Sequence, residues 1–250
     1  MTYLLSSLTA DSRPQLLKSL RRKMEGVEGA RRQEKEILST GCPALDRLLP
    51  RGGLARGTLV EWLAEQPGSG AGMLALLAAR QASREGRALV VLDRFRRFYP
   101  PAAAAWGIDF ANLLVVRPSS EKEALWALDQ VLRSPSVGAV WAPLEDIDIR
   151  EFRRLQLAAE SGGTLGLLLR PASFRDKPSW AELQLLVRPQ AGSGGWRLSV
   201  EITRARSGTS GQSVDLEMND QTGIAQPVIK SHDSHPLYPS TKLARPAASG

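Results

Sequence analysis

The chain has 250 residues, of which 42% are hydrophobic, and this is enough for one full α/β domain with short extensions. Its formal charge of +7 favours an acidic partner, with nucleic acid as the first candidate, although net charge describes association rather than fold. The single cysteine, Cys42, excludes an internal disulfide and a cysteine-based metal cluster. The first ten residues lack the order of a signal peptide and no stretch is long enough to span a membrane, so we expect a cytoplasmic protein.

Residues 1–36 are predicted to form a helical N-terminal arm. Between Pro14 and Lys35, apolar side chains recur at three- and four-residue steps, which places them along one stripe of a helix. Such a stripe packs either on its own domain or on a partner protein. The residues of this candidate partner-binding surface are Leu16, Leu17, Leu20 and Met24.

Residues 37–206 are predicted to form the core domain. Short apolar runs alternate with helical patterns, as in a mostly parallel sheet covered by helices on both faces. The predicted strands are 58–63, 88–92, 113–116, 137–142 and 164–169, and the predicted helices are 73–84, 101–107, 121–132 and 149–161. Two further strands, 182–188 and 196–204, are joined by a glycine-rich connection, and we expect them to be antiparallel with one solvated face.

Residues 207–250 are predicted to form a flexible tail. Their composition turns to Gly, Ser, Thr and Pro, and disorder is expected to dominate beyond Thr222. His232 and His235 lie there without a carboxylate-rich scaffold, so no metal site is predicted.

A strand, a glycine-rich turn and a helix follow one another at 58–84, which is the setting of a phosphate-binding loop. The turn contains Gly68, Ser69, Gly70, Ala71 and Gly72. In an active loop, a lysine stands where this chain has Ala71, and a serine or threonine that binds magnesium stands where it has Gly72. Two of the strongest contributions to phosphoryl transfer are therefore missing, and we interpret the turn as a structural element that binds no cofactor.

Two more catalytic positions lack the expected groups. The strand 137–142 meets Pro143 where a magnesium-ordering aspartate would stand, and the strand 88–92 leads into Asp93, Arg94 and Phe95 with no glutamate to polarise water. The acidic residues 145–148 fit a helix N-terminus better. Because the folded part also lacks a histidine and a Gly-x-Ser-x-Gly elbow, we predict no catalytic residue.

Several segments resemble the RecA superfamily. Residues 38–46, with the sequence Leu-Ser-Thr-Gly-Cys-Pro-Ala-Leu-Asp, resemble the opening of the RecA core, and Gly52-Gly53-Leu54 with Gly57 is similar to the approach to its ATP-binding strand. Trp106-Gly107-Ile108-Asp109 resembles the next turn of that core. Within the superfamily the chain is most similar to the ImuA family, RecA-like proteins of bacterial mutagenesis cassettes, through residues 98–102 and 153–160. The likeness covers about residues 36–206 and implies a RecA-like P-loop NTPase core.

The resemblance implies a non-catalytic accessory protein in DNA-damage-induced translesion synthesis, part of the SOS response. Its partners would be RecA and error-prone polymerase or polymerase-like mutagenesis proteins, with indirect or weak DNA contact and no membrane. The intervals 143–149 and 171–178 leave little room for the DNA-binding loops of a recombinase. A RecA-like ATPase or DNA-binding protein in recombination or repair, and a cell-division inhibitor on the same fold, remain alternatives.

Two basic clusters leave alternatives open. Arg204 and Arg206 resemble the basic pair with which a RecA protomer reaches its neighbour's ATP, so they could cap a filament end or be solvated arginines at an edge. Arg94, Arg96 and Arg97 would suit phosphate, an acidic partner surface or plain solvation.

Overall fold

The computed structural model describes residues 35–84, 86–191, 196–208, 210–219 and 225–228. Its strands are β1 (Ile37–Leu38), β2 (Leu54–Ala55), β3 (Leu59–Ala64), β4 (Ala88–Leu92), β5 (Leu113–Val116), β6 (Val137–Pro143), β7 (Leu165–Pro171), β8 (Leu183–Gln190), β9 (Trp196–Ala205), β10 (Ser213–Met218) and β11 (Ala225–Pro227). Its helices are α2 (Pro43–Leu48), α3 (Ala71–Ala82), α4 (Pro100–Ala105), α5 (Glu121–Arg133) and α6 (Ile149–Gly162), with the 3-10 turns η1 (Phe110–Asn112) and η2 (Ala172–Phe174). In these residues, no helix combines the length and the apolar character needed to cross a membrane.

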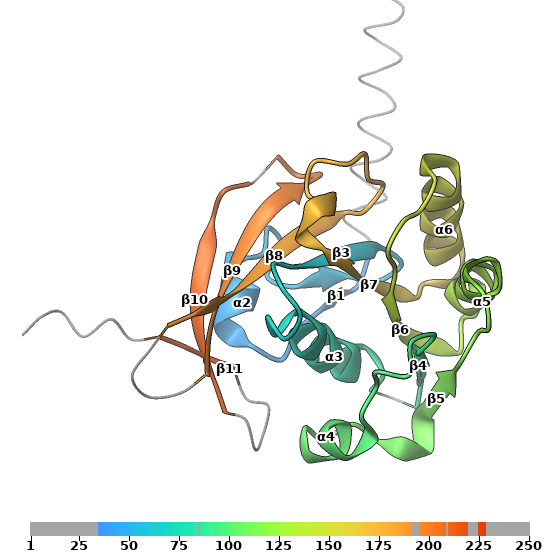
Figure 1. Ribbon diagram of the computed structural model, residues 1–250, viewed down its shortest axis with the longest axis horizontal. Coiled ribbons are helices and arrows are strands. Elements are labelled where there is room, and N and C mark those ends of the chain that lie inside the picture. Colours follow the sequence, from blue (N-terminus) through green and yellow to red (C-terminus); the bar gives the residue numbers. More distant parts are fainter. Residues whose placement is uncertain (1–34, 85, 192–195, 209, 220–224, 229–250) are drawn as a thin grey trace, which may run out of the picture.

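One large sheet organises the fold, with the strand order β11-β10-β9-β8-β3-β7-β6-β4-β5 (Figure 1). Six neighbouring strands of this sheet are parallel, in the order β8-β3-β7-β6-β4-β5. The strands β9, β10 and β11 extend the sheet beyond β8 in antiparallel fashion. This arrangement confirms the predicted α/β class with antiparallel strands at the C-terminal end. The predicted strands 88–92 and 113–116 coincide with β4 and β5, because their boundaries are marked by abrupt changes from apolar to polar residues.

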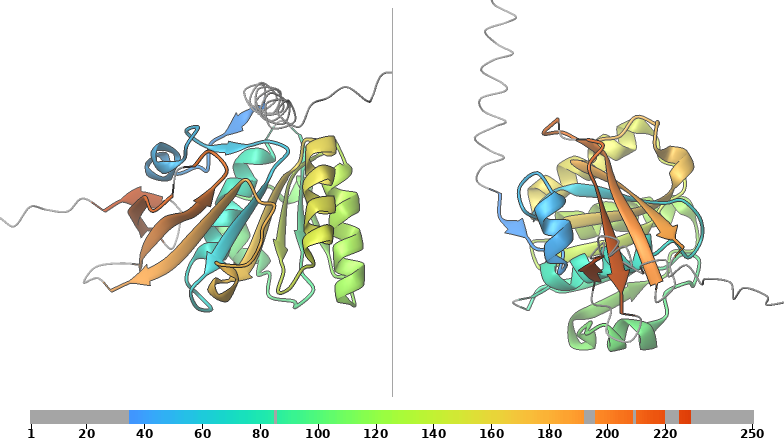
Figure 2. Two further views of the ribbon diagram at one scale, coloured as in Figure 1. Left: turned by 90° about the horizontal axis from the view of Figure 1, so that it is seen from above. Right: turned by 90° about the vertical axis from the view of Figure 1, so that its left-hand side faces the viewer.

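Helices cover both faces of the sheet (Figure 2). One core surrounds α3 and α2 and includes Trp62, Leu167 and Leu198, and a second core under α5 and α6 includes Phe152 and Leu128. Because successive side chains of a strand point to opposite faces, β3 contributes to both cores and is apolar at nearly every position.

The tail prediction is wrong for two short segments. β10 pairs with β9 from Ser213 opposite Glu201 to Met218 opposite Trp196, and β11 pairs with β10. Leu216 and Met218 are buried against the α3 core, so this part of 207–250 completes the domain. The alternation Val-Asp-Leu-Glu-Met was hidden by the polar composition around it. Residues 209, 220–224 and 229–250 of the predicted tail lie outside the described residues, as do residues 1–34 of the predicted arm.

Local signals set the ends of α5 and α6. Ser120 Oγ accepts from the Glu123 backbone N–H at 3.2 Å, and Glu123 accepts in return from the backbone N–H of Ser119 at 2.7 Å. The hydrogen bonds from Ser119 lower the pKa of Glu123. Asp148 caps α6 by accepting from the Arg150 N–H at 2.7 Å, as predicted for the acidic residues there, and Gly163 ends the helix in the left-handed conformation.

An ion pair is buried between two central strands. Arg170 of β7 donates to Glu61 of β3, with 2.5 Å between Nη1 and Oε1, and neither side chain is more than 2% exposed. The second oxygen of Glu61 accepts from Ser179 Oγ at 2.7 Å and from Gln184 Nε2 at 3.0 Å. Gln184 accepts in turn from Thr203 Oγ1 at 2.7 Å. The carboxylate therefore connects β3 with β7, β8 and β9.

The guanidinium of Arg170 is also enclosed. It lies 4.3 Å from the ring centroid of Phe174 in η2 and 5.7 Å from that of Phe152 in α6. Its Nη2 lies 3.4 Å from the backbone carbonyl oxygen of Glu145 and donates to it. The pair thus fixes the segments that follow β6 and β7 at the carboxyl end of the sheet.

Breaking this pair on one side only should be costly. We expect Arg170→Met to lower the free energy of unfolding by about 3–5 kcal/mol, because it leaves the Glu61 carboxylate buried and unpaired. The double variant Glu61→Leu/Arg170→Met removes both charges and is expected to recover most of that loss, as measured by urea denaturation. A single variant as stable as the double would contradict this interpretation.

Candidate functional site

The glycine-rich turn lies between β3 and α3, as predicted. The Ser69 N–H donates to the Gln66 carbonyl at 3.1 Å, and the first helical N–H bond runs from Leu74 to the Gly70 carbonyl at 3.0 Å. Gly68 and Gly70 have φ values of +80° and +89°, a left-handed conformation that favours glycine. The helix begins at Ala71, two residues before the predicted start, because Gly70 already serves as its N-cap.

Core packing explains the glycine at position 70. A Cβ atom there would lie 2.5 Å from Cδ1 of Leu198, which belongs to β9 and to the α3 core. The left-handed backbone favours glycine at this position, and a side chain would fit only if the buried Leu198 shifted. Neither constraint involves a ligand.

An indole stands beside the position of the missing magnesium ligand. Trp141 of β6 donates from Nε1 to the Gly72 carbonyl at 2.9 Å. A Cβ at Gly72 would lie 3.4 Å from Trp141 Cζ2, so the ring occupies the neighbourhood into which a serine or threonine side chain would extend. Phe98 packs against the same indole, with 6.3 Å between the ring centroids.

The turn retains one feature of an anion site. Ser69 is 1% exposed, and its Oγ has no hydrogen-bond partner among the described residues. Together with the N-terminus of α3 it could hold an anion weakly. No group of three or more His, Cys, Asp or Glu side chains is placed to bind a metal in the described part of the chain.

The carboxylate at the end of β4 is already used within the protein. Asp93 is 1% exposed, and its Oδ1 accepts from the backbone N–H groups of Arg97 at 2.7 Å and Phe98 at 3.2 Å. Its Oδ2 lies 3.6 Å from Arg117 Nε. Pro143, the last residue of β6, pairs with Leu169 of β7 and brings no carboxylate. The residues present at this edge therefore do not fit magnesium-bound ATP.

The lone thiol offers no alternative nucleophile. Cys42 is buried at the start of α2, and burial raises the pKa of its thiol. A raised pKa keeps the sulfur protonated and unreactive near neutral pH.

The structure places Arg204 and Arg206 against the segment that follows β7. Arg204 Nη1 donates to the Lys177 carbonyl at 3.2 Å, and Arg206 Nη2 donates to the Trp180 carbonyl at 3.1 Å. The guanidinium of Arg206 lies 5.4 Å from the Trp180 ring centroid, and that of Arg153 lies 4.4 Å from it. Both arginines hold this segment in place, and a contact with a partner's nucleotide stays a prediction.

The other predicted partner-binding residues, Leu16, Leu17, Leu20 and Met24, lie outside the described residues. Their role also stays a prediction.

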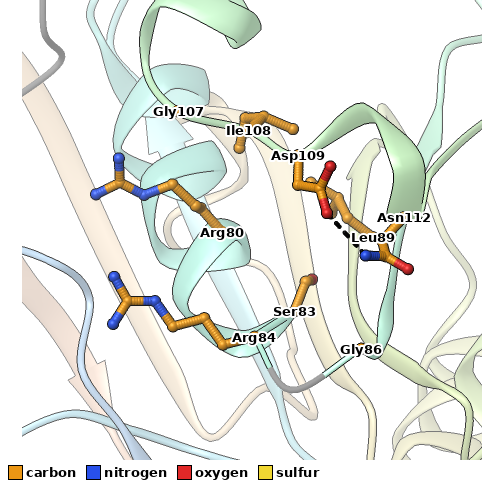
Figure 3. A pocket seen from close by; sticks show the side chains of 9 residues that line it. All are labelled: Arg80, Ser83, Arg84, Gly86, Leu89, Gly107, Ile108, Asp109 and Asn112. Atoms are coloured by element: carbon orange, nitrogen blue, oxygen red, sulfur yellow. Dashed lines mark hydrogen bonds between the residues drawn. The ribbon is translucent and has the colours of Figure 1, made fainter.

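Sequence reasoning missed a cavity of about 310 Å³ at the far end of α3 (Figure 3). Arg80 in the last turn of α3 and Arg84 just after the helix extend in the same direction, and Asn112 donates to Asp109 across a 2.8 Å hydrogen bond. Arg80 Nη1 donates to the Trp106 carbonyl at 2.5 Å, and burial together with the nearby Arg84 lowers the pKa of Arg80. These residues are far apart in the sequence, so no local pattern indicated the cavity.

Comparisons with known proteins agree with this geometry. The model of the RecA N-terminal domain matches residues 23–142. The structure of the RadB recombinase aligns with a TM-score of 0.61 at 18% identity, covering 77% of this chain and all of RadB. Protein RecA of Nostoc sp. is 36% identical over an aligned region that covers 44% of this chain and 30% of that RecA. The chain therefore has a RecA-like fold.

A more extensive similarity is to Protein ImuA of Caulobacter vibrioides. It is 29% identical and covers 87% of this chain and 94% of the ImuA sequence. The family resemblance indicated by the sequence motifs is thereby confirmed.

The packing of the turn can be tested at Gly70. We expect Gly70→Ala to destabilise the protein by about 2–5 kcal/mol, because left-handed backbone strain adds to the clash with Leu198. Gly68→Ala is the matched control: its φ is also positive but nothing lies within 4 Å, so about 1–2 kcal/mol is expected. Thermal and urea unfolding give both values, and equal losses would exclude the contribution of Leu198. The double variant Gly70→Ala/Leu198→Ala should lose less stability than the sum of the losses in the two single variants, because removing the Leu198 side chain relieves the clash.

Proposed function

We propose that this chain is a non-catalytic accessory protein in DNA-damage-induced translesion synthesis. It acts as an adaptor between RecA and error-prone polymerase or polymerase-like proteins. The similarity to ImuA and RecA supports a RecA-related role in mutagenesis and repair. The observation that carries the non-catalytic part is the glycine-rich turn, which keeps its strand–turn–helix geometry while the groups that handle ATP and magnesium are replaced.

Replacements at three separate sites support the loss of hydrolysis. Ala71 and Gly72 provide neither a cation nor a hydroxyl, Pro143 provides no carboxylate, and Phe95 stands where a water-polarising group would follow β4. Each removes a different contribution to phosphoryl transfer, so restoring one would not restore the reaction.

An adaptor needs surfaces rather than a reaction centre. The short connection from β6 to α6 and the segment after β7 are tied to the domain by Arg170, Arg204 and Arg206. This supports a rigid body that partners recognise by shape and charge. The arm residues Leu16, Leu17, Leu20 and Met24 remain the proposed contact with a protein partner.

Nucleotide binding tests the non-catalytic proposal. We expect calorimetry with millimolar ATP and magnesium to give no binding heat, because the lysine and the magnesium ligand are absent. RecA titrated under the same conditions serves as the positive control. Micromolar binding, or any turnover of ATP, would overturn the proposal and favour a RecA-like ATPase.

The arm gives a second test. We expect Leu17→Asp/Leu20→Asp to abolish co-purification with RecA or the mutagenesis polymerases while the circular dichroism of the domain stays unchanged, because two charges interrupt the apolar stripe. Arg21→Asp/Arg22→Asp, next to the stripe, is the control for added acidity. Loss of the folded core in the leucine variant would instead place the stripe against its own domain.

A further inference from the structure

The segment from the end of β4 through α4 carries two adjoining surfaces. The arginine turn comprises Arg94, Arg96 and Arg97, which follow the buried Asp93. The α4 surface comprises the exposed residues Tyr99, Pro100, Pro101, Ala104 and Ala105. Both belong to one continuous stretch that also contains Phe98. Phe98 packs against Trp141, which donates to the Gly72 carbonyl of the glycine-rich turn.

The backbone of the arginine turn is fixed from inside. Asp93 accepts two backbone N–H groups of the turn, from Arg97 and Phe98, and the Arg96 N–H donates to the Asp93 carbonyl at 3.2 Å. Phe98 is 8% exposed and anchors the following residues against Trp141. The turn is therefore a preorganised platform from which the arginine side chains project.

The geometry of the turn strains the backbone at Arg96. Its φ is +54°, the single positive value at a non-glycine residue in the described part of the chain. Left-handed backbone is unfavourable for a side chain with a Cβ, and a residue without one would fit there more easily. Strained residues of this kind cluster where a side chain is needed for binding.

The carboxylates of the described residues leave the three guanidinium groups without an ion pair. In the described residues, no Asp or Glu oxygen lies within ion-pair distance of Arg94, Arg96 or Arg97. Asp93, the carboxylate closest in sequence, is buried and lies 3.6 Å from Arg117, which brings a fourth positive charge. Arg94 and Arg97 both lie over the Phe95 ring, 5.2 and 5.1 Å from its centroid, which restricts their orientation. The cluster is thus oriented and available for an anionic group.

The adjoining α4 surface is apolar rather than basic. Tyr99 is 67% exposed, and the next exposed residues are prolines and alanines. Proline and alanine lose almost no side-chain entropy when a partner covers them. Tyrosine and arginine are enriched among the residues that dominate protein interfaces. A phosphate backbone would use the arginines but would gain nothing from covering this small apolar helix.

We propose that the arginine turn and the α4 surface together dock an acidic, partly apolar segment of a partner protein. Its carboxylates bind Arg94, Arg96 and Arg97, and its apolar side chains cover Tyr99 and the exposed face of α4. The inference rests on the proposed function, because it requires that the chain has protein partners.

The test compares charge reversals on two faces. Arg94→Glu/Arg97→Glu alters the arginine turn, and Lys122→Glu/Arg150→Glu makes the same change in net charge at exposed positions of α5 and α6. Affinities for purified RecA and for the mutagenesis polymerase proteins are measured by fluorescence anisotropy, with labelled oligo(dT) as a separate probe. We expect the turn variant to lose affinity for one of these proteins by about tenfold or more, and the control to keep it, because like charges repel across the interface. Tyr99→Ala, which changes no charge, should weaken the same complex.

The outcomes separate the inference from the proposed function. If the wild-type chain binds none of these proteins, the adaptor function and the docking surface are both excluded. If it binds one and the turn variant binds equally well, the docking surface alone is excluded. If the turn variant loses only oligo(dT) binding, the arginines serve nucleic acid and the inference is overturned.

Cross-linking identifies the partner's groups. Carbodiimide joins a lysine amine to a carboxylate, so Arg97→Lys in the complex is expected to give an amide bond to an Asp or Glu of the partner, detected by mass spectrometry. Arg150→Lys on α6 is the matched control. Cross-links from Arg150→Lys with none from Arg97→Lys would place the interface elsewhere.

Discussion

The ion pair between Glu61 and Arg170 is the interaction on which the carboxyl end of the sheet depends. Two charges taken out of water are tolerable when they are paired and most of their other donors and acceptors are matched. Here Ser179 and Gln184 donate to Glu61, and two aromatic rings enclose Arg170, whose Nε alone has no hydrogen-bond partner among the described residues. Ser179 and Phe174 belong to the connection between β7 and β8. The pair therefore converts the connection between β7 and β8 into a fixed part of the domain, which Arg204 and Arg206 hold from the other side.

The same reasoning explains why the glycine-rich turn persists without the groups that bind ATP. Gly70 is held by its left-handed backbone and by Leu198, and Gly72 by the hydrogen bond from Trp141 to its carbonyl. These constraints come from core packing against β9 and β6. A turn that the core requires can be kept when its ligand-binding residues are replaced, because changing it would disturb the contact between α3 and the sheet.

Local patterns predicted most of the elements but few of the contacts between them. The apolar runs of β4 and β5 and the glycine-rich turn have signals within a few residues, so their positions followed from the sequence. Glu61 and Arg170 are 109 residues apart and lie in strands whose other residues are almost all apolar, so nothing near either one indicated its partner. β10 was not predicted for a related reason. Its five alternating residues are too few to indicate a strand by themselves, and the strand is evident only from its pairing with β9. The replacements at Ala71, Gly72 and Pro143 were visible in the sequence, whereas the indole beside Gly72 required the fold.

Arg96 differs from these residues because no ion pair of its side chain in the described residues offsets the strain of its backbone. A left-handed arginine costs about 1–2 kcal/mol relative to an unstrained residue, and glycine at this position would avoid most of that cost. Buried charges such as Arg170 offset their cost through contacts inside the protein, but the Arg96 side chain is exposed and makes no ion pair in the described residues. Stability of the isolated domain therefore does not account for an arginine here. In the docking proposed for the arginine turn, the partner's carboxylates would supply the interaction that compensates for this strain.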